Sequence, residues 1–315
     1  MRRTIHQQIS ANTRLSIVYG AMVILLLAAL GGAIVGYYAP EFFVVGIAGS
    51  AALGLIVALV AWNSGSDIVL KMNQARDATP HELQVVNNVT EEMAIAAGIP
   101  TPHVYVIDDP SPNAFATGRG PKKGVVAVTT GLLARLDREE LQGVIAHEVG
   151  HIRNNDIKFM TTLAIVVGLI PMVSHFFLRS LWYSGGGRRR SGDGGGQGQL
   201  IFFAIALVLA VLAPLFARLL ELAVSRRREF MADASAAQFT RNPEGLASAL
   251  EKIAGSGLKM EAANKATEHM YIINPFQALE ARGIFSTHPP THERIAALRG
   301  LSGLDYRRYL GQEEP

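Results

Sequence analysis

The stretch Leu141–Ile152, LQGVIAHEVGHI, decides how the rest of the chain is interpreted. It holds His147, Glu148 and His151 in the spacing H-E-x-x-H, and residues four apart on a helix project from the same face. Two imidazoles can therefore bind one metal ion while the glutamate points into the same space. Two imidazoles and one carboxylate suit zinc and leave a fourth position for water, whose proton a nearby glutamate can accept. The pattern predicts a zinc site that hydrolyses peptide bonds.

The residues around this motif predict an amphipathic helix. Asp137 and Glu140 have the spacing of a capping box, and apolar residues follow at helical intervals along one side. The alternative interpretation, two exposed histidines on a surface helix, requires the glutamate between them to be accidental. Charged and polar residues at 137–140 and 153–156 flank the motif, which argues against a helix buried inside a membrane span.

The composition favours a membrane protein. Of the 315 residues, 49% are hydrophobic and only 17% are charged, which is unusual for a water-soluble chain. The chain contains no cysteine, so a transition metal must be bound by histidine and carboxylate. The net charge is +3, and the basic residues lie around apolar segments rather than among aromatic residues, which argues against nucleic-acid binding.

Four apolar segments predict four membrane-spanning helices. Leu15–Tyr38 and Phe42–Trp62 contain no charged residue, and each is long enough for a bilayer, which needs about 20 residues. Phe159–Leu178 and Leu200–Ala217 form a second pair, each with an internal proline of the kind that spanning helices tolerate. The arginines near the N-terminus place that terminus, the motif helix and the C-terminal part in the cytoplasm by the positive-inside rule.

A low-complexity linker, Gly185–Gln199, joins the second pair of spans. Counting the spans places this linker outside the membrane, where Arg188, Arg189 and Arg190 oppose the positive-inside rule. Arg226–Arg228 after the fourth span favour the original orientation, which we retain.

The sequence predicts a soluble domain in two parts. A helix opens at Thr79-Pro80 and ends at Gly98, and another follows Asn242-Pro243 and ends at Gly255. Short strands are predicted at His103–Ile107, Asn113–Thr117 and Gly124–Val128. The expected fold class is an α+β membrane protein: four transmembrane helices and a mainly helical cytoplasmic domain that carries a small β-sheet. The expected division is 1–14 as a cytoplasmic N-terminus, 15–62 and 159–222 as membrane pairs, and 63–158 and 223–315 as the two parts of the domain.

Two histidines leave zinc short of one ligand, which catalytic sites of this type usually take from a carboxylate. The second soluble segment offers Glu221, Glu229, Asp233, Glu244 and Glu251. Glu229 and Asp233 lie four apart on a predicted helix, so one can bind the metal while the other orients an imidazole N–H. A solvated acidic face beside Arg226–Arg228 is the alternative interpretation.

Three motifs follow one another along the chain: His147-Glu148-Val149-Gly150-His151, Glu229-Phe230-Met231-Ala232-Asp233, and His288-Pro289-Pro290 with Arg294. Their order and spacing, together with the spans, resemble the HtpX family of membrane heat-shock proteases, which is related to the CAAX prenyl proteases. The resemblance covers nearly the whole chain. It implies a zinc endopeptidase of bacterial or archaeal plasma membranes. It assigns one Zn²⁺ per chain to His147, His151 and Glu229, the general base to Glu148, and the orienting acceptor to Asp233.

Asn113, Ala114 and Phe115 begin a segment, NAFATG, that is similar to the family's edge strand beside the metal helix. The resemblance implies that an extended substrate pairs with this strand through main-chain hydrogen bonds. Such pairing gives broad specificity, because backbone groups are common to every peptide.

His288 and Arg294 are the remaining candidates near the metal. His288 lies in the loop STHPP, where an imidazole held near zinc either stabilises the oxyanion or occupies the open metal position in a resting state. The alternative is an ordinary loop histidine at the start of a helix. Arg294 either orients His288 or pairs with a carboxylate.

The motifs and the spans predict a membrane-anchored zinc endopeptidase, and the resemblance implies that it cleaves misfolded or damaged membrane proteins at the cytoplasmic face of the plasma membrane under stress. Expected partners are the lipid bilayer and unfolded or membrane-protein substrates. Other membrane proteases are candidate partners, and nucleic acid is not expected. The alternatives are a non-catalytic zinc-binding membrane adaptor, although structural zinc usually has four protein ligands, and an intramembrane-cleaving metalloprotease.

Overall fold

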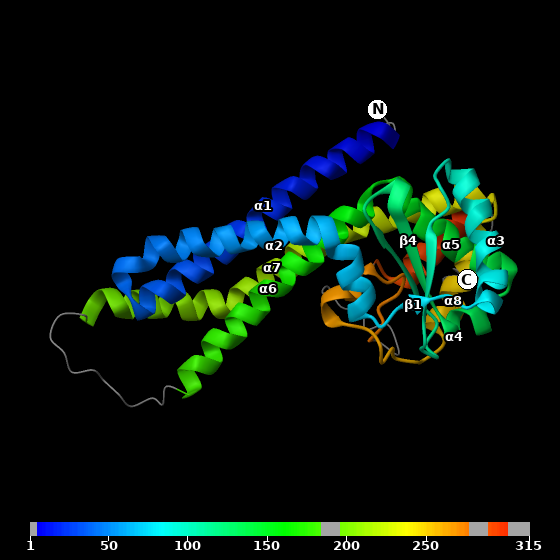
Figure 1. Ribbon diagram of the computed structural model, residues 1–315. Coiled ribbons are helices and arrows are strands. Elements are labelled where there is room, and N and C mark those ends of the chain that lie inside the picture. The colour runs from blue at the N-terminus through cyan, green and yellow to red at the C-terminus, as the bar shows by residue number, and fades with distance from the viewer. Residues whose placement is uncertain (1–4, 184–195, 277–288, 302–315) are drawn as a thin grey trace, which may run out of the picture. The chain divides into compact units, whose positions relative to one another are not determined.

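The computed structural model describes residues 5–183, 196–276 and 289–301, which are drawn as ribbons in Figure 1. The chain divides into two compact units. The first unit is formed by residues 1–61 and 162–224, and the second by residues 62–161 and 225–315. Each unit therefore combines segments that are distant in the sequence.

The first unit is built from long helices. They are α1 (Ile5–Tyr38), α2 (Phe43–Met72), α6 (Asp156–Tyr183) and α7 (Gly196–Thr240), with a short 3-10 turn at Pro40–Phe42 between the first two. The helical segments long and apolar enough to cross a membrane are Ile17–Tyr38, Pro40–Met72, Asp156–Tyr183 and Gly198–Leu220. Much of their apolar surface is not covered by protein, as expected for helices that face lipid. The prediction of four spans is confirmed.

Close packing holds the helices of the first unit together. A Cβ atom on Gly31 of α1 would collide with the Ser50 side chain of α2, so these two helices approach at a distance that only glycine permits. At the end of α1, the Tyr37 ring contacts Phe177 of α6 and Phe203 of α7, at centroid distances of 6.1 and 5.2 Å. The proline inside α6 and the one inside α7 interrupt neither helix.

The second unit carries a four-stranded sheet in the order β1-β2-β4-β3. The strands are β1 (Arg76–Asp77), β2 (His103–Ile107), β3 (Ala114–Gly118) and β4 (Gly124–Thr129). Strands β2 and β4 are parallel, whereas β1–β2 and β3–β4 pair antiparallel. The three predicted strands are confirmed to within one residue at each end. The sequence did not indicate β1, because two residues are too short to show a periodic pattern.

The sheet is covered on both faces within the second unit. Val104, Val126 and Val128 point to one face, where they pack with α3 (Pro80–Ala97) and α5 (Arg138–Arg153) in a single core. Alternate residues such as Ile107 and Ala127 point to the other face and pack with the end of α2 and with residues 260–271. The remaining helices of this unit are α4 (Thr130–Arg135), α8 (Pro243–Ala254) and α9 (Thr291–Leu301).

Helix α5 begins and is positioned as its sequence predicts. The Asp137 side chain accepts a hydrogen bond from the Glu140 amide, and the Glu140 side chain accepts one from the Asp137 amide, both at 3.0 Å. Helix α8 lies against α5 at Gly143, where a Cβ atom would come within 2.6 Å of the Leu246 backbone. The predicted caps of α8, Asn242 and Gly255, are also confirmed.

Candidate metal centre

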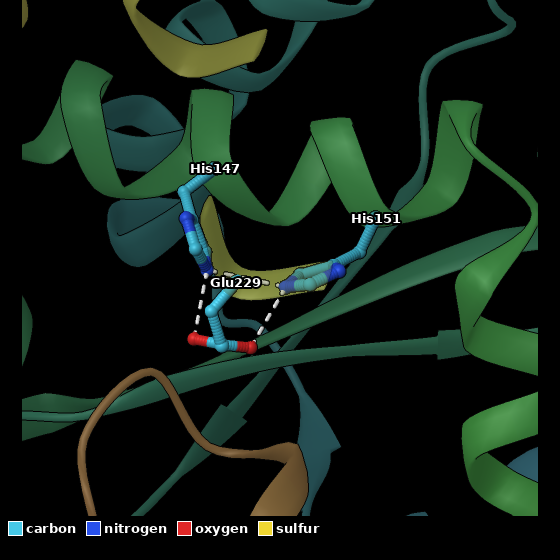
Figure 2. Close-up of side chains that lie close together, drawn as sticks. All are labelled: His147, His151 and Glu229. Atoms are coloured by element: carbon cyan, nitrogen blue, oxygen red, sulfur yellow. Dashed lines mark hydrogen bonds and ion pairs between the residues drawn. The ribbon is translucent and has the colours of Figure 1, made fainter. Parts of the chain in front are cut away.

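Two helices bring three potential metal ligands together in the second unit. His147 and His151 project from α5, and Glu229 projects from the C-terminal part of α7 toward them (Figure 2). The two Nε2 atoms are 3.2 Å apart, and the Glu229 carboxylate oxygens lie 3.8 Å from His147 Nε2 and 3.4 Å from His151 Nε2. Ligand atoms about 2.1 Å from a tetrahedral zinc ion lie about 3.4 Å from one another. The three side chains therefore have the spacing that one zinc ion requires.

Gly150 of the motif allows α7 to approach α5 closely. A Cβ atom at this position would lie 3.1 Å from the Ser235 Cβ and 3.4 Å from the Ala232 carbonyl oxygen. A larger side chain would push this part of α7 away from α5, and Glu229 lies on the same turn of α7 as Ala232. The glycine between Glu148 and His151 thus helps to bring the third ligand to the two histidines.

His147 is held by a carboxylate and an arginine. Asp233 Oδ1 lies 2.9 Å from His147 Nδ1, so the Nδ1–H group donates to Asp233 and the Nε2 lone pair faces the metal position. Arg294 donates from Nε and Nη2 to the two Asp233 oxygens, at 2.9 and 2.7 Å. Arg294 Nη1 also donates to the Ile272 carbonyl at 2.7 Å and lies 3.2 Å from Glu229. Of the two roles predicted for Arg294, the structure shows the pairing with carboxylates.

Burial and charge set the protonation states of this group. Burial lowers the pKa of His147 and keeps the ring neutral, as a metal ligand must be. Burial opposes ionisation of Asp233, but the charge of Arg294 and the hydrogen bond from His147 bring its pKa below the usual range. Burial alone would lower the pKa of Arg294, yet the charges of Asp233 and Glu229 raise it above its usual value. The carboxylate and the guanidinium are therefore both ionised at neutral pH.

Glu148 is buried beside the metal ligands. Within the part of the chain that the structure describes, neither of its carboxylate oxygens makes a hydrogen bond of normal geometry, although the backbone of Ala116 lies near enough to favour the charged form. Burial raises the pKa of Glu148 to about 8, and the charge of Glu229 adds to this, while His151 opposes it. A buried polar group without a partner costs about 1–3 kcal/mol, so this carboxylate is poised for a water or a substrate.

Glu148 lines a partly open pocket whose lining residues all belong to the second unit. The lining residues are Ala116, Glu148, His151, Asp156, Ile157, Met160, Glu229, His269 and Met270. Two of the ligands, the predicted base and one residue of strand β3 thus share one cavity. The candidate ligands and the candidate base therefore border the same space.

Sequence reasoning missed three residues of this site. Asp156 Oδ2 lies 3.4 Å from His151 Nδ1, and Arg228 Nη1 lies 3.0 Å from Asp156 Oδ1. Burial would lower the pKa of His151, but its contacts with Asp156 and Glu229 raise it to about 10. The sequence indicates Arg228 only as one of the basic residues that orient a membrane span. In the structure Arg228 is instead 3% exposed and pairs with Asp156. The third residue, His269, lies in a segment without a recognisable motif.

The predicted substrate-binding residues lie at the edge of the sheet, on β3 and just before it. The outer edge of this strand is partly paired with the chain itself: the Ala114 carbonyl accepts from the Ile272 amide, and Asn113 Nδ2 donates to the Ile273 carbonyl, both at 2.9 Å. Phe115 forms a β-bridge with Tyr271. The next residue, Ala116, reaches the pocket. His288 lies outside the described residues.

Known proteins resemble the chain over nearly its full length. The model of peptidase family M48 matches residues 80–302, which include the three ligands. A protein named "Protease HtpX homolog" from Caldanaerobacter subterraneus subsp. tengcongensis is 44% identical over 304 residues, 96% of this chain and 99% of that protein. A protein of the same name from Dictyoglomus thermophilum is 46% identical over 296 residues, 94% of each chain.

Among solved structures, the crystal structure of S. mikatae Ste24p matches with a TM-score of 0.48 and 21% identity, covering 93% of this chain and 66% of that chain. Family membership rests on the sequence matches, and the matched region contains the His147, His151 and Glu229 group of the structure. The chain therefore belongs to peptidase family M48 and to its HtpX-type membrane metalloproteases.

Proposed function

We propose that the chain is a zinc-dependent endopeptidase that cleaves extended segments of misfolded or damaged membrane proteins on the cytoplasmic side of the plasma membrane. One observation carries the proposal. The buried carboxylate of Glu148, which accepts no hydrogen bond of normal geometry among the described residues, lines the same pocket as His151 and Glu229. A carboxylate in that position is a general base for hydrolysis rather than part of a closed structural metal site.

The donor set favours zinc. His147 and His151 would hold the ion through Nε2, and Glu229 would hold it through a carboxylate oxygen, which leaves room for a fourth ligand. When bound, zinc activates a water molecule near neutral pH and polarises the scissile carbonyl. Asp233 fixes the tautomer of His147, and Arg294 neutralises the surplus carboxylate charge around the ligands.

Glu148 carries the proton through the reaction. Its raised pKa makes it a stronger base than a carboxylate in water, because burial disfavours the charged form. One carboxylate oxygen accepts the proton of the attacking water, and the same group then donates it to the leaving amine nitrogen. Proton transfer by a positioned group typically contributes about 10²–10⁴-fold to the rate. His288 is retained as a proposed oxyanion stabiliser or resting-state ligand.

The substrate strand is proposed to pair with the outer edge of β3 beyond Phe115. The Asn113 carbonyl accepts from Thr129, and the Arg119 amide donates to Lys123, so odd-numbered residues direct their backbone groups toward β4. The groups of Ala114, Ala116 and Gly118 consequently face outward. Ala114 is paired with Ile272 and Phe115 bridges Tyr271, so the substrate strand is proposed to pair with the outward groups that follow them, at Ala116 and Gly118.

Pairing from Ala116 onward places a peptide carbonyl next to Glu148, because Ala116 lines the same pocket. The substrate contacts first predicted at 113–115 are therefore proposed to shift toward 116–118. Main-chain pairing of this kind depends on backbone groups and little on the substrate's side chains. It therefore allows many different damaged proteins to bind. Helix α5 is not among the described helices that can span a membrane, so cleavage at the membrane edge is favoured over cleavage within it.

The proposal is tested by removing and restoring the metal. The full chain is purified in detergent with a chelator present, zinc is then added, and degradation of an unfolded substrate protein is followed by gel electrophoresis. We expect no cleavage in chelator and cleavage after addition of about one zinc per chain. Cleavage that continues at the same rate in excess chelator would contradict the metal-dependent function.

A further inference from the structure

The two ligand histidines are each backed by a carboxylate, and only one of these carboxylates lies in a motif of the sequence. His151 directs Nε2 toward Glu229 and His147, and its other ring nitrogen, Nδ1, lies 3.4 Å from Asp156 Oδ2. This is a long hydrogen bond. It can fix the tautomer and the rotation of the His151 ring only if the carboxylate of Asp156 is itself held in place.

The chain holds Asp156 in two ways. First, α5 ends at Arg153 and α6 begins at Asp156, with Asn155 between them in the left-handed region at φ 60°. Asparagine adopts this conformation more readily than most residues, and the tight turn returns Asp156 beneath the ring of His151. Asp156 also stands in the first turn of α6, where the helix dipole favours a negative charge.

Second, Arg228 pairs with Asp156. Its Nη1 lies 3.0 Å from Asp156 Oδ1 and 3.4 Å from the Asp156 backbone carbonyl, and its guanidinium lies 4.9 Å from the centroid of the Phe159 ring. Both side chains of the ion pair are only 4% exposed. A buried guanidinium is costly unless it is paired, so this arrangement is strongly constrained. Arg228 also directly precedes Glu229, so the same turn of α7 carries the third ligand.

The arrangement repeats the one around His147. There the sequence of contacts runs from His147 to Asp233 to Arg294, and Arg294 also contacts Glu229. Around His151 it runs from His151 to Asp156 to Arg228, the neighbour of Glu229. Each histidine thus has a carboxylate on Nδ1, and each carboxylate has a buried arginine. Neither Asp156 nor Arg228 is a metal ligand by this geometry.

We propose that Asp156 and Arg228 are positioning residues that hold His151 and the Glu229 turn in the geometry required for zinc. This inference rests on the proposed zinc function. The pair connects the first residue of the third candidate span with a residue that follows the fourth. It gives His151 a carboxylate–arginine support like that of His147. The H-E-x-x-H and Glu229–Asp233 motifs do not contain these two residues.

The test measures zinc affinity rather than turnover. Full-length chain carrying Glu148→Gln, which prevents self-cleavage, is purified in detergent, and zinc is titrated against a chromophoric chelator. Asp156→Asn and Arg228→Gln are each compared with this parent. We expect zinc to bind about 10–100-fold more weakly in both, the range typical for residues that orient ligands. The double variant should be no weaker than about the worse single variant, because the two residues act through one contact.

The matched control is Arg299→Gln. Arg299, a largely buried residue of α9, pairs with the partly exposed Glu244 and Glu251 of α8, outside the metal site. Its loss should lower Tm while leaving zinc affinity within about twofold. Arg228→Lys, which keeps the charge, should recover part of the affinity, and the absorption spectrum of the cobalt-loaded protein should change in Asp156→Asn but not in Arg299→Gln.

The outcomes distinguish a failure of the proposed zinc function from a failure of the positioning role of Asp156 and Arg228. A parent chain that binds no zinc would overturn the proposed function itself. A parent that binds zinc, with Asp156→Asn and Arg228→Gln lowering only Tm as Arg299→Gln does, would overturn the positioning role alone. If Asp156→Asn does not fold, Arg228→Gln decides: an affinity equal to that of the parent, with an unchanged cobalt spectrum, contradicts the proposal.

Discussion

At the residue scale, burial prepares the side chains of the metal centre for different tasks. His147 and Glu148 are adjacent in α5 and both 1% exposed, yet burial acts on them in opposite senses. It lowers the pKa of His147, which favours the neutral ligand, and raises the pKa of Glu148 to about 8, which favours proton uptake. A ligand and a base thus arise from one turn of helix because the charged form of each is disfavoured there.

Glu229 decides whether the site can hold zinc. Glu229→Ala removes the only carboxylate that faces both Nε2 atoms within the described residues, so we expect zinc content to fall by at least about tenfold and cleavage to be lost. Metal analysis after gel filtration measures this. Glu91→Ala, which removes an exposed glutamate of α3, serves as the control and should keep its zinc. Full zinc occupancy in Glu229→Ala would show that the ligand set is wrong.

At the element scale, local sequence signals predicted the elements that carry the motifs. The capping box of α5, the caps of α8 and the three longer strands are encoded by residues near each other in the chain. The pairing of Asp156 with Arg228 could not be predicted in this way. A basic residue after an apolar segment looks the same whether it faces water or a buried carboxylate, and only the tertiary contact between α6 and α7 distinguishes the two.

If a substrate pairs with strand β3, proline at particular positions of the substrate should block its cleavage. A peptide that pairs with Ala116 and Gly118 must donate backbone N–H groups at alternate positions, and proline has none. Single proline substitutions along a fluorogenic peptide should therefore reduce kcat/KM by at least about tenfold at alternate positions near the cleaved bond. Alanine at the same positions is the control. Equal cleavage of all proline peptides would rule out pairing with this strand.

At the scale of the whole molecule, the ligand set is completed only after the chain has passed through α6 and α7. His147 and His151 precede the second pair of candidate spans, and Glu229 follows them. The two parts of the second unit must consequently lie on the same side of the membrane. Hydropathy predicted the spans, and the positive-inside rule predicts that this side is the cytoplasm.

The absence of cysteine from the sequence makes this orientation directly testable. Glu41→Cys places a thiol in the short turn Pro40–Phe42 that follows the first candidate span, and Lys122→Cys places one in an exposed turn of the second unit. In intact cells, a membrane-impermeant maleimide should label Glu41→Cys only. Lys122→Cys should react after the membrane is permeabilised. Labelling of Lys122→Cys in intact cells would place the metal centre outside.

The proposal that Glu148 acts as the base of a zinc endopeptidase is tested most directly by one paired measurement on Glu148→Gln. The variant and the unaltered chain are loaded with zinc, and zinc content and the initial rate of degradation of an unfolded protein are determined on the same samples. We predict equal zinc content and a rate lower by about 10²–10⁴-fold in the variant. Comparable rates at equal zinc content would contradict the assignment of Glu148 as the base.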